Sequence, residues 1–307
     1  MIAATGAVLL AGALFALPAA SAATLPEASS ENWAGYVASP VNGSSDFSSV
    51  SGSWVQPSAN SSAGDGYSAF WVGLGGAGQS QSLEQIGTQA DVTGGQTVYY
   101  AWYELVPSVP VKLSLAIHPG DHIAASVSVS GTNVTVSLSD QTTGASYTNT
   151  LQMSNPDASS AEWIAEAPSA ADGQGDYQPL PLADFGTINF TGASATAAGH
   201  TGSISDSQWT TQAVQLGSSS SAGAQPSALS SDGSSFSVAW ESTGAGNGAS
   251  SGGYGTSGGS GSGGYGGYGG GGGYGYGGSG YGYGGYGGGS GYGGSTGYGQ
   301  LGYVFPY

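Results

Sequence analysis

The sequence predicts an all-β protein in which antiparallel strands pack as a sandwich. Short runs rich in Val, Ile, Tyr, Trp and Thr recur along the middle of the chain, separated about every eight to twelve residues by Gly, Ser, Asn and Asp. Many short strands at regular spacing are typical of a sandwich or a barrel. No segment has the repeat of a long amphipathic helix, which favours strands throughout.

The runs that predict strands alternate apolar and polar side chains, as a strand with one buried face does. One of them begins a hairpin over residues 133–151, because Thr143-Gly144 in its middle is suited to a turn. The runs are residues 49–56, 68–75, 97–106, 111–117, 122–130, 133–140, 162–167, 186–196 and 235–240.

Composition also separates the two ends of the chain from this domain. Residues 1–22 are interpreted as a secretory signal peptide, because an apolar stretch, too short for a membrane span, ends in the small-x-small pattern Ala20-Ser21-Ala22. A short N-terminal segment, 23–31, leads into the β-sandwich domain at 32–242. Residues 243–307 consist almost wholly of Gly, Ser and Tyr, which predicts a disordered tail that we expect to mediate surface association.

The charge balance is extreme, with 18 Asp and Glu against a single Lys or Arg and a formal net charge of −17. Nucleic acids and anionic membranes are bound through cationic side chains, so neither is expected as a partner. In strong acid such a chain approaches neutrality and escapes the positive self-repulsion that expands ordinary proteins. Composition therefore favours a protein adapted to acid over one that is merely acidic and secreted, and we expect it to be a monomer. Without cysteine, it has neither disulfides nor thiolate metal sites.

Most standard catalytic sets are missing from the sequence. His118 and His122 have the spacing of two zinc ligands on a helix, but Pro119-Gly120 between them predicts a solvated turn, and His200 is remote. We therefore expect no metal and no cofactor. The Asp-Thr-Gly and Asp-Ser-Gly loops of pepsin-like enzymes are absent, and only the tail offers Gly-Ser-rich candidates for a serine nucleophile.

Acidic and aromatic residues share strand faces more than once. In AEWIAEAP, residues 161–168, alternation places Glu162 and Glu166 on one face and Trp163 on the other. In YYAWYELVP, the same alternation places Tyr100, Trp102 and Glu104 on one face. Core tryptophans and solvated glutamates would explain single residues. A third strand, SLEQIGTQ, has Leu83, Gln85 and Gly87 on one face and Glu84 on the other. The repeated combination of acidic and aromatic residues favours a cleft that binds an extended ligand.

Six blocks of the sequence resemble, in their order and spacing, those of the glutamic peptidases, or eqolisins. They are NWAGYV (32–37), WVGLGG (71–76), LEQIGT (83–88), YAWYELVP (100–107), AEWIAEAP (161–168) and ADFGTINFTGASAT (183–196). The resemblance spans about residues 30–242 and implies a sandwich similar to the concanavalin A-like proteins. It also implies pepstatin-insensitive acid endopeptidase activity on polypeptides by a Gln and Glu pair.

Carried over by motif, the resemblance makes Gln85 and Glu166 the catalytic pair. In this reading ionised Glu166 takes a proton from a water and later returns it to the departing amine, since an isolated glutamate ionises near pH ~4.3. Gln85 supplies an amide donor to the oxyanion, worth ~3 to 4 kcal/mol in other enzymes. Glu162 then supports the pair or lines the cleft. The matched residues expected to bind substrate are Trp33, beside Asn32, and Trp71, Trp102 and Glu104.

The sequence departs from the family at three places and leaves two other functions open. Fungal members usually have Asp where this chain has Gly75 and Gln89, and acidic residues where it has Ala167-Pro168; these departures bear on subsite preference and working pH. The alternatives are a non-catalytic carbohydrate- or surface-binding module and a two-carboxylate glycosidase. A glycosidase would need Glu104 and Glu166 close together. The pair formed by Gln85 and Glu166 favours the peptidase.

Overall fold

A computed structural model describes most of the region predicted to form the β-sandwich domain. The predicted signal peptide and the Gly/Ser/Tyr tail lie outside the described residues. Within those residues every regular element is a strand, which confirms the all-β prediction, and no helix is long and apolar enough to cross a membrane. The described residues are 27–41, 46–78, 80–171, 177–217 and 222–242.

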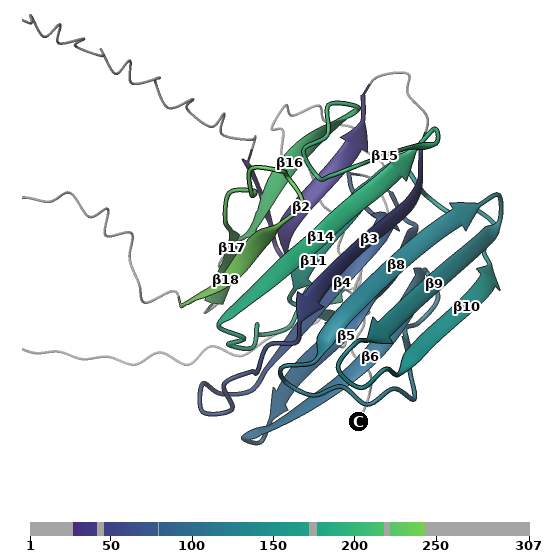
Figure 1. Ribbon diagram of the computed structural model, residues 1–307. Coiled ribbons are helices and arrows are strands. Elements are labelled where there is room, and N and C mark those ends of the chain that lie inside the picture. Colours follow the sequence, from purple (N-terminus) through teal and green to yellow (C-terminus); the bar gives the residue numbers. More distant parts are fainter. Residues whose placement is uncertain (1–26, 42–45, 79, 172–176, 218–221, 243–307) are drawn as a thin grey trace, which may run out of the picture. The chain divides into compact units, whose positions relative to one another are not determined.

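The strands form one continuous sheet that folds over to give two layers (Figure 1). What we call the first sheet contains, in spatial order, β10 (Ser146–Gln152), β9 (Asn133–Asp140), β8 (His122–Ser130), β3 (Phe47–Val55), β14 (Thr187–Ala197), β18 (Phe236–Ser242) and β17 (Ala222–Pro226). The second sheet contains β16 (Trp209–Leu216), β2 (Trp33–Pro40), β11 (Ala161–Glu166), β4 (Gly66–Gly75), β5 (Leu83–Thr93), β6 (Gln96–Val106) and β7 (Val111–Lys112).

Four short strands complete the fold. β1 (Glu27–Ser30) pairs in parallel with β16, and β15 (His200–Gly202) pairs with β14. β12 (Ser169–Ala171) and β13 (Tyr177–Pro179) form a separate two-stranded sheet. The two large sheets are joined where Leu216 of β16 pairs with Ala224 of β17. The antiparallel sandwich expected from the sequence is therefore confirmed.

Most predicted strands are present, including the hairpin of β9 and β10, and the exceptions have a physical reason. Residues 111–117 form a strand only at 111–112, although Leu113, Leu115 and Ile117 are buried as the alternation requires. The backbone N–H of Leu113 still donates to the Ala101 carbonyl oxygen of β6 at 2.8 Å, and beyond it the segment leaves β6 and passes towards β8 of the other sheet. The strand β2 is not among the predicted runs because most of its residues are buried on both faces, so the alternation is lost.

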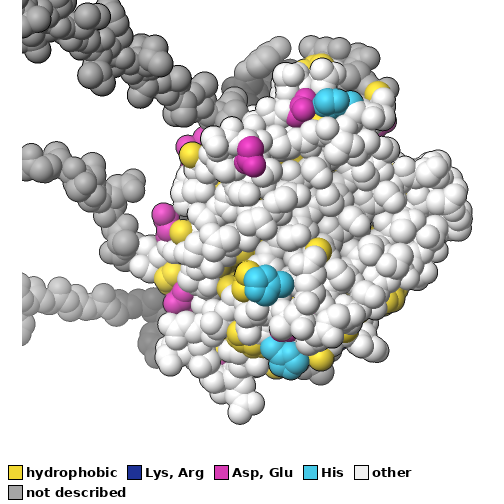
Figure 2. All heavy atoms as spheres, in the orientation of Figure 1, with side chains coloured by type: hydrophobic (Ala, Val, Ile, Leu, Met, Phe, Trp, Pro, Cys, Tyr) yellow, Lys and Arg dark blue, Asp and Glu magenta, His cyan; other side chains and the backbone are white. Residues whose placement is uncertain are grey.

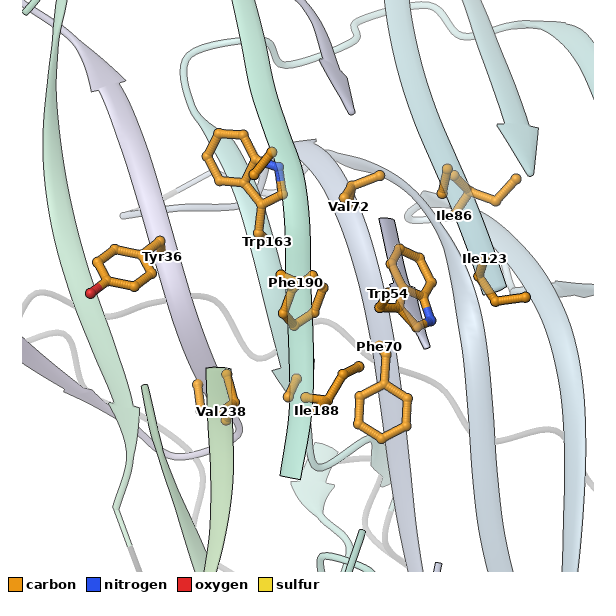
Figure 3. Close-up of a cluster of buried hydrophobic side chains, with 14 of the residues drawn as sticks. Tyr36, Trp54, Phe70, Val72, Ile86, Ile123, Trp163, Ile188, Phe190 and Val238 are labelled. Atoms are coloured by element: carbon orange, nitrogen blue, oxygen red, sulfur yellow. The ribbon is translucent and has the colours of Figure 1, made fainter. Parts of the chain in front are cut away.

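The core between the sheets is rich in aromatic side chains (Figure 3). Trp54 and Phe190 have ring centroids 5.7 Å apart, and Phe190 stacks on Phe236 at 4.9 Å. Trp163 of β11 is fully buried here and donates its indole N–H to the Ser51 carbonyl oxygen at 2.8 Å. Because Trp163 points into this core, its neighbours Glu162 and Glu166 point to the opposite face of the second sheet, as the alternation predicts.

The face of the first sheet that points away from the core consists largely of Ser and Thr. Figure 2 shows few acidic or hydrophobic side chains on the face over β3, β8 and β14. Strand register aligns these hydroxyl side chains in rows across the sheet. One row is Thr150, Thr135, Ser128, Ser49 and Thr196, and the next is Thr148, Ser137, Ser126, Ser51 and Ser194.

Candidate functional site

The face of the second sheet that points away from the core carries an apolar cluster of its own, which we call the outer cluster. Its residues come from β2, β4, β5, β6, β11 and β16 and are almost fully buried. Trp33 and Trp71 meet edge to face within it, with ring centroids 5.1 Å apart. The cluster consists of Trp33, Val37, Ala69, Trp71, Leu83, Tyr100, Trp102, Val106, Ile164 and Val214.

Strand register brings the sequence-predicted site residues into three adjacent rows on this face. Directly opposed residues of paired strands share a face, so the rows follow from the pairing alone. The first row is Glu162, Gly73, Gln85 and Glu104; the second is Ile164, Trp71, Gly87 and Trp102; the third is Trp33, Glu166, Ala69, Gln89 and Tyr100.

Glycine is required where the second row crosses β5. A Cβ atom on Gly87 would lie 2.2 Å from the Phe70 carbonyl oxygen and 2.6 Å from Cβ of Trp71, well inside van der Waals contact. The absence of a side chain at Gly87 leaves room for the Trp71 indole on the same face. Glycine at position 87 thus allows Trp71 to lie beside the acidic residues of the neighbouring rows.

The carboxyl of Glu166 is buried and held by two donors. Trp71 Nε1 donates to one oxygen at 2.7 Å, and Asn32 Nδ2 donates to the other at 3.0 Å. Burial raises the pKa of Glu166 well above its ordinary value of 4.5, and the nearby carboxyl of Glu104 raises it further. The hydrogen bond from Trp71, the nearby Trp33 indole and the hydrogen bond from Asn32 act in the opposite direction. The net effect favours the neutral carboxyl of Glu166 to a higher pH than in an isolated glutamate.

Gln85 and Glu104 form the second half of the candidate site. Gln85 Nε2 donates to Glu104 Oε2 at 2.8 Å, and both side chains are almost fully buried. Burial raises the pKa of Glu104 to about 8, although the hydrogen bond from Gln85 lowers it in part. Gln85 Oε1 and Glu104 Oε1 make no hydrogen bond within the part of the chain that the structure describes. Each is thus available to a water or a substrate group.

A second pair of buried acids lies close to this site. Glu162 is fully buried, and neither of its carboxyl oxygens has a hydrogen bond of ordinary geometry to a described residue. Burial raises its pKa well above 4.5, with the charges of Asp157 and Glu84 acting in the same direction. Burial raises the pKa of Glu84 to about 8, while a 3.0 Å hydrogen bond from the Asp157 backbone N–H opposes the shift. Glu84 is therefore uncharged well below pH 8, and the neutral form of Glu162 is favoured in the same way, which makes the burial of both acids tolerable.

The departures at residues 75 and 89 have distinct structural settings. Gly75 has φ +81°, and a Cβ there would lie 2.6 Å from the Asp157 carbonyl oxygen, so an aspartate does not fit this backbone. Gln89 Nε2 donates to Asp91 Oδ1 at 2.8 Å, and the Tyr100 hydroxyl donates to Asp91 Oδ2 at 2.8 Å. The sequence pointed to neither Asp91 nor Asp157, although alternation from Gln89 places Asp91 on the same face.

The histidines occupy the setting expected of them. Pro119 and Gly120 form a turn before β8, and the backbone N–H of His118 donates to Asp121 Oδ2 at 2.7 Å. His200 Nε2 lies 3.0 Å from Asp206 Oδ2. Among the residues described, no three His, Asp or Glu side chains are grouped so as to hold a metal ion.

The fold and the grouped site residues agree with a defined class of protein. The model of the Peptidase A4 family matches residues 31–240, and the chain belongs to this family. The resemblance to the glutamic peptidases is thereby confirmed, and the chain is a peptidase of that type. Family membership favours this activity over both the binding module and the glycosidase.

Individual relatives support the same assignment. Aspergillopepsin-2 of Aspergillus niger is 32% identical over 208 residues, which cover 60% of this chain and 70% of the relative. A scytalidoglutamic peptidase solved with a transition-state analogue inhibitor is 27% identical, with a TM-score of 0.58, over 68% of this chain and 98% of its own. A member of the eqolisin family solved with the tripeptide Ala-Ile-His matches the same shares at a TM-score of 0.54 and 27% identity.

Proposed function

We propose that this protein is a secreted endopeptidase that cleaves polypeptides in acid, with Glu166 and Gln85 as catalytic residues. The observation that carries the proposal is the buried Glu166 carboxyl, held by Trp71 and Asn32 at 2.7 and 3.0 Å on the face that also carries Gln85. Both residues stand at the positions that the glutamic-peptidase motifs predict. The single cation among 18 acids suits work in acid, where the carboxylates are neutral.

Because burial raises the pKa of Glu166, we propose an order of proton transfers in which the neutral carboxyl begins the reaction, beside the order expected from the sequence. A neutral Glu166 can give its proton to the scissile carbonyl oxygen while its other oxygen takes one from the attacking water. The product of this step is a gem-diol, and the carboxyl is neutral again. In the second step Glu166 gives a proton to the amine nitrogen as the C–N bond breaks and recovers one from a diol hydroxyl. Each step leaves the number of protons on Glu166 unchanged.

Gln85 is proposed to orient the carbonyl and the water. Its amide keeps one N–H beyond the hydrogen bond to Glu104, and its Oε1 has no partner among described residues. The N–H donates to the carbonyl oxygen as negative charge develops there, and Oε1 accepts from the water. A preorganised donor of this kind contributes ~3 to 4 kcal/mol to other enzymes. An amide does not titrate, so the donor persists at any acidity.

The test compares three nearly isosteric variants. Glu166→Gln should abolish cleavage, because an amide cannot exchange protons as a carboxyl does. Gln85→Glu should be close to inactive, because it replaces the donor with a group that competes for the same proton. Glu162→Gln should retain measurable activity, since we assign it no proton transfer. Casein and peptide hydrolysis are measured at pH 2 to 5 with and without pepstatin, after circular dichroism has verified folding.

Two results would overturn the assignment. If folded Glu166→Gln cuts at the wild-type rate while Glu162→Gln is inactive, the wrong glutamate has been chosen. If both variants cut normally, or if pepstatin blocks the wild type, the Gln and Glu pair does not account for the activity.

A further inference from the structure

The only Lys or Arg in the sequence, Lys112, lies beside the outer cluster. It sits on the exposed edge strand β7 and pairs directly with Trp102 of β6. Its Nζ stands 4.3 Å from the centroid of the Tyr100 ring, another member of the cluster. The one fixed cation of a chain with net charge −17 is thus placed at the border of the proposed substrate-binding face.

Lys112 is exposed, and none of the described carboxylates forms an ion pair with it. It also lines a cavity of about 370 Å³ that lies against residues 111–116 and 145–147. Beside it, the indole Nε1 of Trp102 is buried and makes no hydrogen bond to a described residue. A cation–π contact and protection of a sheet edge account for the position of a lysine. They leave its charge unneutralised and the neighbouring indole donor unused.

We propose that Lys112, with Trp102 Nε1 as a second donor, forms a subsite that binds a carboxylate of the polypeptide substrate. The proposal rests on the proposed function and names a substrate feature that the site selects. A carboxylate matches an ammonium and an indole N–H, both of which only donate. The rest of this acidic protein repels anions, so the preference depends on this one side chain. The carboxylate comes either from an acidic side chain or from the C-terminus of the peptide.

Matched peptides separate these two sources. In the first set, the two peptides of each pair differ only in having Glu or Gln at one position flanking the cleaved bond, and each flanking position is tested in turn. In a further pair, one peptide has a free C-terminus and the other an amidated C-terminus. The ratio of kcat/KM within a pair should be about fivefold in favour of the carboxylate at pH 5 to 6, as for an exposed ion pair. The ratio should approach one near pH 2 to 3, where a peptide carboxyl is protonated. The ionisable groups near Lys112 include Tyr100, Tyr103 and Tyr147, with Asp91 behind Tyr100, and the buried Glu104 two residues from Trp102 on the same face of β6.

Three variants assign the effect to Lys112. Lys112→Met should bring the ratio to about one, and Lys112→Arg should keep it. Lys112→Met combined with Thr150→Lys, on the exposed edge strand β10 of the first sheet, restores the net charge and should not restore the ratio. Calorimetric binding of the same peptides gives a second ratio that needs no cleavage.

The outcomes keep the two proposals apart. The subsite is refuted if Lys112→Met leaves both ratios unchanged, or if Thr150→Lys restores them. Absence of cleavage by the wild type with a binding ratio that depends on Lys112 refutes the proposed function and supports the subsite. Normal cleavage with ratios that do not depend on Lys112 supports the proposed function and refutes the subsite.

Discussion

The two sheets of the sandwich turn very different faces away from their shared core. On the first sheet the outward side chains are hydroxyls that bond one another, as Ser137 and Thr148 do at 2.8 Å and Ser51 and Ser194 at 2.9 Å. On the second sheet they are tryptophans and carboxylic acids, and Glu104, Glu162 and Glu166 are each at most 1% exposed. Both faces come from strands with the same period of two.

The difference shows that alternation assigns a side chain to a face but does not determine whether that face is buried. Hydroxyls suit an exposed sheet because they bond to each other or to water at little cost. A buried carboxyl without full hydrogen bonding is costly when charged, and its pKa rises instead. The second sheet therefore concentrates carboxyl groups whose pKa values burial raises, to about 8 for Glu104 and well above 4.5 for Glu162 and Glu166. Perturbed acids gathered on one face are typical of a functional site.

The largest expected effect is on stability at neutral and alkaline pH, through a buried acid that the proposed reaction does not use. The pKa of Glu84 rises from 4.5 to about 8 in the folded protein, because burial favours the neutral carboxyl. The contribution of this neutral carboxyl to the free energy of unfolding is therefore fully present below pH 4.5 and is lost as the pH rises to about 8. Glu84→Gln cannot ionise and keeps an oxygen for the Asp157 N–H. The variant should match the wild type at pH 4 and be more stable at pH 8.

Thermal unfolding at pH 4 and pH 8 measures this difference, for which ~5 kcal/mol is the upper limit at about 1.4 kcal/mol per pH unit. The control is Asp232→Asn, which also removes one carboxylate, but at a position where the pKa is lowered. This variant should not alter the change in stability between pH 4 and pH 8. A wild type that melts at a higher temperature at pH 8 than at pH 4 would contradict the account of the buried acids.

A smaller effect is expected from the indole that holds Glu166. The hydrogen bond from Trp71 lowers the pKa of Glu166, so Trp71→Phe should raise that pKa further. If neutral Glu166 is the active form, the decline of kcat/KM with rising pH should move to higher pH. Trp240→Phe is the control, because Trp240 lies on β18 of the first sheet and its indole makes no hydrogen bond to a described residue. A rate that instead increases as Glu166 ionises would restore the general-base order of proton transfers.

The smallest effect is expected on the hydroxyl face. Ser137→Ala removes the 2.8 Å hydrogen bond to Thr148 at the surface and should change the free energy of unfolding by less than ~0.5 kcal/mol. Peptide hydrolysis should stay at the wild-type rate. Urea unfolding and the casein assay check both statements, and a loss of activity would show that the two faces are coupled.

The sequence by itself determined the class of fold and the face on which each candidate residue lies. Period-2 patterns and turn residues predict the strands, and the motif blocks select Gln85 and Glu166, because both signals are local along the chain. The pattern failed where burial extends to both faces, as in β2, and where Leu115 and Ile117 are buried outside any strand.

Only the tertiary structure decided which residues meet and how they titrate. Asn32 and Glu166 are 134 positions apart in the chain and come together because β2 pairs with β11. The hydrogen bond between Gln85 and Glu104 likewise depends on the register of β5 with β6. Burial, and with it the raised pKa of Glu166, arises from side chains contributed by several strands. No local pattern records that environment, because desolvation is a property of the assembled fold.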